Sequence, residues 1–247
     1  MTLAKILPDI AAEKLGQPKP LIVGVKDVPI RCLWFTRQVL TKQSAFVRLY
    51  DERGIHASRL TKTLFNLTDT ELTTLPQKPS FITNLKQTHN TDINYSCSFD
   101  DFLIVPGIIL NRKLEYSDQW YTTIKIPYIS TCPCASEMCK QTNIGIPHQQ
   151  RSIMKVTTLW TKNLIQVENA LLNLFLMPQT IMTREDELDW CTRASENKNL
   201  VFCEDAARKI GEVLESFGHT EYLIECEHFE SLHSHSMVAV NRKGRFL

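Results

Sequence analysis

The order of predicted secondary structure repeats once along this chain, and that order is the strongest constraint on its fold. Alternating apolar residues predict strands within residues 21–51. Leucines at helical spacing predict a helix over 57–67, and a second helix is predicted over 80–86. Strands over 92–105 and 108–116 complete the order β-β-α-α-β-β. This order predicts an α+β unit.

The second half of the chain follows the same order. Its predicted elements are strands 123–129 and 152–160, helices 162–175 and 204–217, and strands 222–229 and 237–240. The join between the halves falls near residues 115–117. We therefore predict an N-terminal arm over 1–20, a first module over 21–115 and a second module over 116–247.

The composition is that of an ordinary globular protein. Hydrophobic residues make up 43% and charged residues 22% of the 247 residues. The formal net charge is +1, so the composition predicts neither nucleic acid nor a membrane surface as a partner. Charged residues interrupt the N-terminal segment 1–16, and no apolar run approaches the roughly 18 residues of a membrane span. We therefore expect a cytoplasmic protein.

The spacing of the eight cysteines does not indicate a disulfide framework. In the reducing compartment that we expect, they stay thiols. Five of them are predicted to be small core residues: Cys32, Cys97, Cys191, Cys203 and Cys226. The other three lie close together and need a separate explanation.

The remaining cysteines are Cys132, Cys134 and Cys139, and His148 follows them. Thiolates and imidazoles are ligands for divalent metals. Cys132 and Cys134 flank a proline at the end of a predicted strand, and residues two apart in an extended chain project to the same side. Both sulfurs are therefore expected to face one pocket. The alternatives are a closed structural zinc site and ordinary buried cysteines.

A second cluster precedes the last predicted strand and contains Glu230, His233 and His235. Two imidazoles at the end of a strand can move protons near neutral pH. The alternative interpretation is a solvated turn with a surface carboxylate. The pattern indicates proton-transfer chemistry without requiring it.

Four further charged or titratable residues have two interpretations each. Glu204 opens a predicted helix and Glu187 lies in an acid-rich segment, where carboxylates stabilise a helix dipole but can also bind a substrate or a metal. His56 and Arg59 lie where a strand leads into a helix, which suits phosphate binding as well as a simple capping turn. The chain has no Walker loop, dinucleotide-binding glycine motif or nucleophile elbow.

These motifs, taken in order, resemble those of the GTP cyclohydrolase type IB family. The motifs are Gly-Ile-His-Ala-Ser-Arg at 54–59, Thr-Cys-Pro-Cys at 131–134, His-Gln-Gln-Arg-Ser at 148–152, Asp-Glu at 186–187, Phe-Cys-Glu-Asp at 202–205 and Phe-Glu-Ser-Leu-His-Ser-His at 229–235. Each motif alone is weak, and their shared order makes the resemblance specific. It extends from the first predicted strand to the C-terminus.

The resemblance implies tandem tunnelling-fold modules, each β-β-α-α-β-β with an antiparallel sheet and helices on one face. It also implies a homo-oligomer, usually a tetramer, with active sites at subunit interfaces. The implied enzyme, GTP cyclohydrolase I, is a hydrolase that opens the imidazole ring of GTP. Its products are formate and 7,8-dihydroneopterin triphosphate, at the first step of tetrahydrofolate and pterin biosynthesis.

The resemblance also assigns roles to residues at matching positions. The implied metal ligands are Cys132, His148 and Glu187, a set of mixed softness that suits Zn²⁺ or Mn²⁺. The implied catalytic residues are Cys132, Cys134, Glu230, His233 and His235, with His233 or His235 as the proton donor to N7. The implied substrate-binding residues are Glu204 at the guanine edge, and His56, Arg59 and Arg151.

The chain departs from the family pattern in places. The expected loop from Cys132 to His148 is longer than usual, and Gln149 and Ala57 replace the usual Asn and Met. Two alternatives therefore stay open. One is another tunnelling-fold enzyme that acts on a purine-like or pterin-like heterocycle. The other is a non-catalytic binding module stabilised by zinc.

Overall fold

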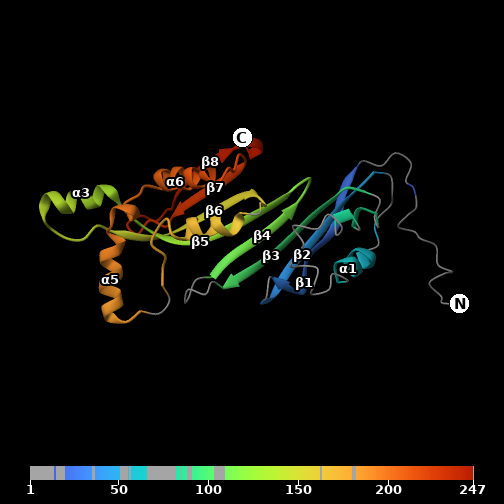
Figure 1. Cartoon of the computed structure of the whole chain (residues 1–247), viewed down its shortest axis with the longest axis horizontal. Helices are drawn as coiled ribbons and strands as arrows, with labels where there is room; N and C mark the ends of the chain where they lie inside the picture. Colours follow the sequence, from blue (N-terminus) through green and yellow to red (C-terminus); the bar gives the residue numbers. More distant parts are fainter. Residues whose placement is uncertain are drawn as a thin grey trace. The chain divides into compact units, whose positions relative to one another are not determined.

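The computed structural model describes residues 14, 20–34, 37–50, 55, 57–65, 82–83, 85–87, 91–102, 109–161, 163–179 and 182–246. The chain divides into two compact units, Met1–Phe99 with Lys113–Trp120, and Asp100–Arg112 with Tyr121–Leu247. Both combine strands with helices, which confirms the predicted α+β class (Figure 1). The predicted division into modules at residue 115 stays a prediction.

The first unit contains an antiparallel sheet with its strands in chain order. The strands are β1 (Leu21–Trp34), β2 (Arg37–Leu49) and β3 (Ile93–Phe102). Helix α1 (Ala57–Phe65) follows β2, residues 82–83 and 85–87 are also helical, and β4 (Ile109–Tyr116) follows β3. Leu60 and Leu64, which carry the predicted helical stripe, are fully buried. The predicted order of elements is confirmed for this half of the chain.

The second unit is built on a four-stranded antiparallel sheet. Its strands are β5 (Trp120–Thr131), β6 (Gln149–Leu159), β7 (Tyr222–His228) and β8 (Met237–Lys243), each paired with the next. Alternate residues of β7 are buried, as expected for a sheet with one covered face. Helices α4 (Leu164–Leu172) and α6 (Cys203–Ser216) provide the cover. Met154 of β6, Leu171 of α4 and Ile210 of α6 belong to one buried apolar cluster.

Two helices of the second unit are absent from the predicted elements. Helix α3 (Pro133–Thr142) replaces the expected loop, because Pro133 suits the first helical turn and Asn143 ends the helix with a left-handed φ of 53°. Helix α5 (Arg184–Ala194) begins with a reciprocal cap between Thr183 and Asp186. Figure 1 shows both helices at the same end of this unit. None of the described helices is long and apolar enough to cross a membrane.

Four of the five cysteines predicted to be core residues are buried. They are Cys32, Cys97, Cys203 and Cys226. Burial raises the pKa of Cys203 to about 11 and that of Cys226 to about 12, so both thiols stay protonated at neutral pH. The prediction is wrong for Cys191, which is exposed on α5. That helix is polar along most of its length, and so its cysteine faces solvent.

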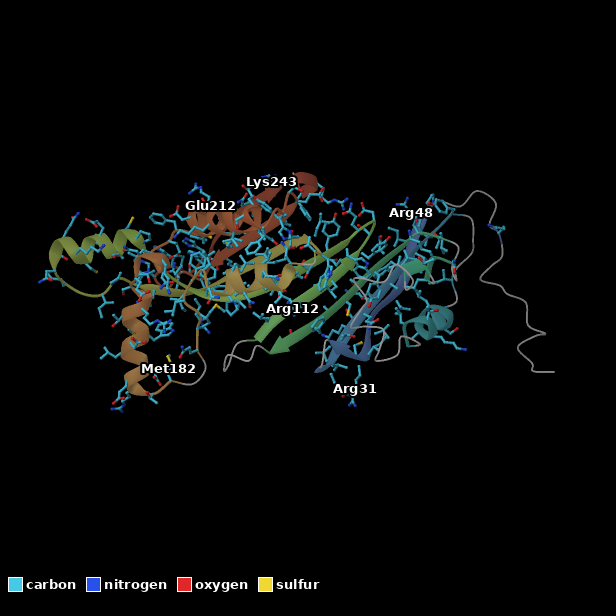
Figure 2. The ribbon with its side chains drawn as sticks, in the orientation of Figure 1. Arg31, Arg48, Arg112, Met182, Glu212 and Lys243 are labelled. Carbon is cyan, nitrogen blue, oxygen red and sulfur yellow. The ribbon has the colours of Figure 1, made fainter. Side chains whose placement is uncertain are left out.

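A buried ion pair joins β4 to α4 within the second unit (Figure 2 labels Arg112). Arg112 Nη1 donates to Glu168 Oε1, and both side chains are at most 10% exposed. Removing one charge of such a pair typically costs about 3–5 kcal/mol, because the other stays buried. We expect Glu168→Gln to lower the free energy of unfolding by about this amount in a urea titration.

The matched control for this prediction is Glu212→Gln, which removes an exposed carboxylate from α6. It is expected to change the free energy of unfolding by less than about 0.5 kcal/mol. If the two variants unfold at the same urea concentration, the ion pair does not stabilise the second unit.

Candidate active site

Polar side chains follow the apolar core on one face of β5, β6 and β7. Tyr128 pairs with Ser152, and Ser152 pairs with His228, so these residues form one row across the sheet. Ser130 and Gln150 form part of the next polar row on this face. All five residues are at most 7% exposed. These rows lie beside the end of β5 and the start of β6.

The polar rows end at a pocket of about 280 Å³. Six of the predicted site residues line it: Cys132, His148, Glu204, Glu230, His233 and His235. They come from the end of β5, the start of β6, the first turn of α6 and the segment between β7 and β8. The fold of the second unit therefore brings together residues that are up to about a hundred positions apart in the sequence.

Cys132 and His148 lie side by side at one wall of the pocket. The Cys132 N–H donates to the His148 carbonyl oxygen at 3.2 Å, which extends the β5–β6 pairing beyond the strands. Both side chains are half-buried. A hydrogen bond of 3.3 Å joins His148 Nδ1 to Ser231 Oγ and orients the imidazole ring. This wall places a thiol beside an oriented imidazole.

Glu230 and two histidines line the pocket from the segment between β7 and β8. Gln150 Nε2 donates to Glu230 Oε1 at 3.2 Å, so a buried amide holds the carboxylate. The rings of His233 and His235 stack, with their centroids 5.2 Å apart and an interplanar angle of 19°. Both histidines are exposed, as the solvated-turn alternative predicts, but they also line the pocket. They can therefore reach both a bound substrate and solvent water.

The two acids at the start of α6 have different surroundings. The Asp205 carboxylate accepts from the Phe202 N–H at 3.3 Å and from Arg208 at 3.1 Å. Asp205 thus stabilises the start of the helix and its dipole. Glu204 is exposed and lines the pocket. Both acids lie in the first turn of α6, so the dipole interpretation still applies to Glu204, which in addition lines the pocket.

Cys134 and Glu187 do not line this pocket among its described residues. The expected extended geometry at Cys132–Cys134 is wrong, because α3 begins at Pro133 and leaves Cys134 exposed in its first turn. Glu187 is exposed on α5, about 10 Å along the helix from Ala194. The Ala194 carbonyl accepts from Thr131 Oγ1 at 2.7 Å, so that end of α5 is fixed beside β5. The roles of Cys134 and Glu187 stay predictions.

Of the residues predicted to bind phosphate, only Arg151 has a described side chain, and it is not among the described residues that line the pocket. His56 and the side chain of Arg59 lie outside the described residues. Arg151 is exposed, whereas its neighbours Gln150 and Ser152 are buried, so Arg151 lies on the opposite face of β6. Their roles stay predictions.

Sequence reasoning missed His228 and Gln150, which also line the pocket. His228 is 2% exposed and Gln150 is 7% exposed. The signal for His228 was its place at the end of the alternation Tyr222, Ile224, Cys226, His228, where a polar residue interrupts a buried face. Gln150 was part of a recognised motif but carried no predicted role.

Protonation of His228 is expected to destabilise the fold in acid. Burial lowers the pKa of His228 from 6.5 to about 4, and the nearby Glu204 charge opposes this only in part. The unfolded chain takes up the proton at higher pH, so stability falls as the pH drops from 6.5 to 4, by up to about 3 kcal/mol. His219, whose pKa burial also lowers, contributes in the same direction.

This pH dependence is measured by urea titrations between pH 7 and pH 4. His228→Asn removes the titrating group, and its stability should therefore fall less steeply over this window than that of the unchanged protein. Parallel curves for the two proteins would show that His228 is not the group responsible.

The donor chemistry at the pocket fits a divalent metal, although a complete ligand set is not assembled. Cys132 and His148 supply sulfur and nitrogen donors, and the pocket also holds carboxylates and further imidazoles. Within the described part of the chain, no three His, Cys, Asp or Glu side chains are grouped closely enough to hold a metal. The roles of Cys132 and His148 as metal ligands therefore stay predictions.

Comparison with known proteins finds one family over nearly the whole chain. Residues 7–239 match the family described as type I GTP cyclohydrolase folE2. A GTP cyclohydrolase FolE2 of Pseudoalteromonas translucida is 29% identical, with 83% of this chain and 85% of the relative aligned. One of Hahella chejuensis is 26% identical, with 98% of each chain aligned. One of Hydrogenovibrio crunogenus is 33% identical over about half of each chain. The similarity spans both units.

Proposed function

Because the chain belongs to the type I GTP cyclohydrolase folE2 family, we propose that it is a metal-dependent GTP cyclohydrolase. It opens the imidazole ring of GTP and forms formate and 7,8-dihydroneopterin triphosphate. The observation that carries this proposal is one pocket lined by six residues from the family motifs: Cys132, His148, Glu204, Glu230, His233 and His235. These motifs occur in the same order as in the GTP cyclohydrolase family, which supports the assignment of this activity to the pocket.

Glu204 binds the guanine base in this proposal. Its two carboxylate oxygens accept from N1–H and from the exocyclic amino group of guanine. Adenine presents an acceptor at N1 and a C–H at C2, so it leaves this carboxylate without a matching pair of donors. The exposure of Glu204 at the pocket, beside a capping Asp205, supports the assignment.

His233 or His235 supplies the proton to N7 as the bond between C8 and the ring nitrogen weakens. The stacked rings lie at the pocket and in solvent, so the donor can be reprotonated from water. Glu230 is held by Gln150 and accepts protons or hydrogen bonds during the second hydrolysis, which releases formate. Cys134 is proposed for the same catalytic shell from the resemblance alone.

Cys132 and His148 would hold the metal, with Glu187 as the third ligand that the resemblance implies. Zn²⁺ and Mn²⁺ both suit a set of one thiolate, one imidazole and one carboxylate. When bound, the metal acts as a Lewis acid and activates water near neutral pH. The adjacent positions of Cys132 and His148 support their assignment, and that of Glu187 rests on the motif order.

The triphosphate is proposed to bind residues of another subunit. No lysine or arginine is among the described residues that line the pocket, although the substrate carries several negative charges. We therefore propose a homo-oligomer, a tetramer by resemblance, with its sites at subunit interfaces. His56, Arg59 and Arg151 are the candidate phosphate ligands. Mixing an inactive Cys132→Ala chain with an inactive Arg59→Ala chain should restore part of the activity if each site uses two chains.

The activity is tested by comparing GTP with ATP in the metal-loaded protein. Oxidation of the product mixture should give a fluorescent pterin from GTP and none from ATP. Equal pterin yield from the two nucleotides would contradict guanine selection by Glu204. Formate release from GTP without a pterin would contradict the complete reaction.

A further inference from the structure

His228 lines the pocket, and both nitrogens of its ring have hydrogen-bond partners. Its Nε2 is 2.8 Å from the Tyr128 hydroxyl, and its Nδ1 is 3.2 Å from Ser130 Oγ. Ser130 Oγ is also 2.9 Å from Ser152 Oγ. All four side chains are at most 2% exposed. The network connects the apolar core, to which Tyr128 belongs, with the pocket, which His228 lines.

The network joins the three strands that end at the pocket. Tyr128 and Ser130 belong to β5, Ser152 belongs to β6 and His228 belongs to β7. Ring nitrogens and hydroxyls in a buried environment make stronger hydrogen bonds than they make in water. These hydrogen bonds therefore link the ends of all three strands.

Those strand ends carry the reactive side chains. Cys132 is two residues beyond Ser130, and Glu230 is two residues beyond His228. Residues two apart in an extended strand project to the same face. The Phe229 N–H donates to the Arg151 carbonyl at 3.0 Å, which continues the β6–β7 pairing toward Glu230. Ser130 and His228 of the network thus lie two residues before Cys132 and Glu230 along their strands.

We propose that His228 is a positioning residue of this site. Through Tyr128 and Ser130 it fixes the strand ends that present Cys132 and Glu230 to the pocket. It does not touch the reacting atoms, because both of its ring nitrogens are engaged by protein hydroxyls. The kinetic test of this inference rests on the proposed function, and the inference itself rests on the hydrogen bonds.

The charge state of His228 suits this role. Burial keeps the ring neutral at pH 7 despite the Glu204 carboxylate, the charged group that raises the pKa of His228. A neutral ring can donate from one nitrogen and accept at the other, as the two hydroxyl partners require. It also leaves the Glu204 carboxylate free of a competing cation. The ring therefore holds its two hydroxyl partners in place and does not act as a general acid.

The chain provides a matched control in His219. This histidine is 5% exposed and its Nδ1 is 2.7 Å from Thr158 Oγ1, so it is also buried and bound to a hydroxyl. Thr158 pairs with Tyr222 at the other end of β6 and β7, and His219 is not among the described pocket residues. The His219 variant therefore measures the effect of losing a buried, hydrogen-bonded histidine that does not line the pocket.

The test compares His228→Ala, His228→Gln and His219→Ala as metal-saturated, folded proteins. We expect His228→Ala to lower kcat for formate release by about 10–100-fold, as small misplacements of reacting groups do, with KM for GTP changed by less than about threefold. His228→Gln should recover part of kcat. Tyr128→Phe added to His228→Ala should slow the enzyme by no more than about twofold further, because both changes remove the same contact.

A second readout does not depend on turnover. Co²⁺ bound in place of the native metal should show a thiolate absorption band from Cys132. This band should shift in His228→Ala, return in His228→Gln and stay unchanged in His219→Ala. If the band is present in wild-type protein and shifted in His228→Ala, but wild-type protein releases no formate, the proposed function fails while the positioning role stands. An unshifted band, together with kcat per folded enzyme equal to that of His219→Ala, would overturn the positioning role.

Discussion

Replacement of Cys132 by alanine is expected to lower kcat for formate release by at least about 1,000-fold, because the metal supplies several kcal/mol of transition-state stabilisation. The same protein should lose bound metal during dialysis. Cys132 is half-buried at the pocket wall, with its backbone paired to that of His148. His148→Ala should have the same two effects, since it removes the neighbouring donor.

Cys139→Ser is the matched control for the Cys132 variant. Cys139 is a half-buried thiol of α3, seven residues from Cys132, and is not among the described residues of the pocket. Its replacement should leave metal content and kcat within about twofold of the unchanged protein, as for most changes away from a site. Full metal retention by Cys132→Ala, or metal loss by Cys139→Ser, would show that the wrong thiol has been assigned.

Replacement of Glu204 by glutamine is expected to lower kcat/KM for GTP by about 100–10,000-fold. The amide has the size of the carboxylate but turns an NH₂ group toward a guanine N–H. In the complex with GTP, a donor that faces a donor is left without a partner, and the lost charge weakens the remaining hydrogen bond. Steady-state kinetics should show the loss, and metal content should be unchanged, because Glu204 is not an assigned ligand.

Glu212→Gln is the matched control on the same helix. Glu212 is exposed on α6, two turns beyond Glu204 (Figure 2). It should keep kcat/KM within about twofold of the unchanged protein. If Glu204→Gln retains full selectivity for GTP over ATP, the carboxylate does not read the guanine edge.

The strands and the apolar helices could be predicted from periodicity. Alternation over residues 124–128 of β5 and along β7, and the leucine stripe of α1, match the buried faces of the structure. Helix α3 could not be predicted in this way, because it has little apolar face and is defined by Pro133 at its start and Asn143 at its end. Polar helices such as α3 and α5 lack the regularly spaced apolar residues by which a helix is recognised in a sequence.

The candidate site was predictable in its residue types and only partly in its geometry. The motifs identified Cys132, His148 and Glu204, which meet at one pocket. His228 was missed because its partner Tyr128 lies 100 residues away, and only strand pairing reveals their contact. The phosphate ligands were not located, because no described cation lines the pocket and a second chain is proposed to supply them.

The most direct test of the central claim uses metal-stripped protein incubated with GTP before and after addition of Zn²⁺ or Mn²⁺. Formate and the oxidised, fluorescent pterin are measured in the same samples. We predict that both products appear only after metal is added, in equal amounts. Folded, metal-loaded protein that releases neither product would contradict the assignment of this pocket as a GTP cyclohydrolase active site.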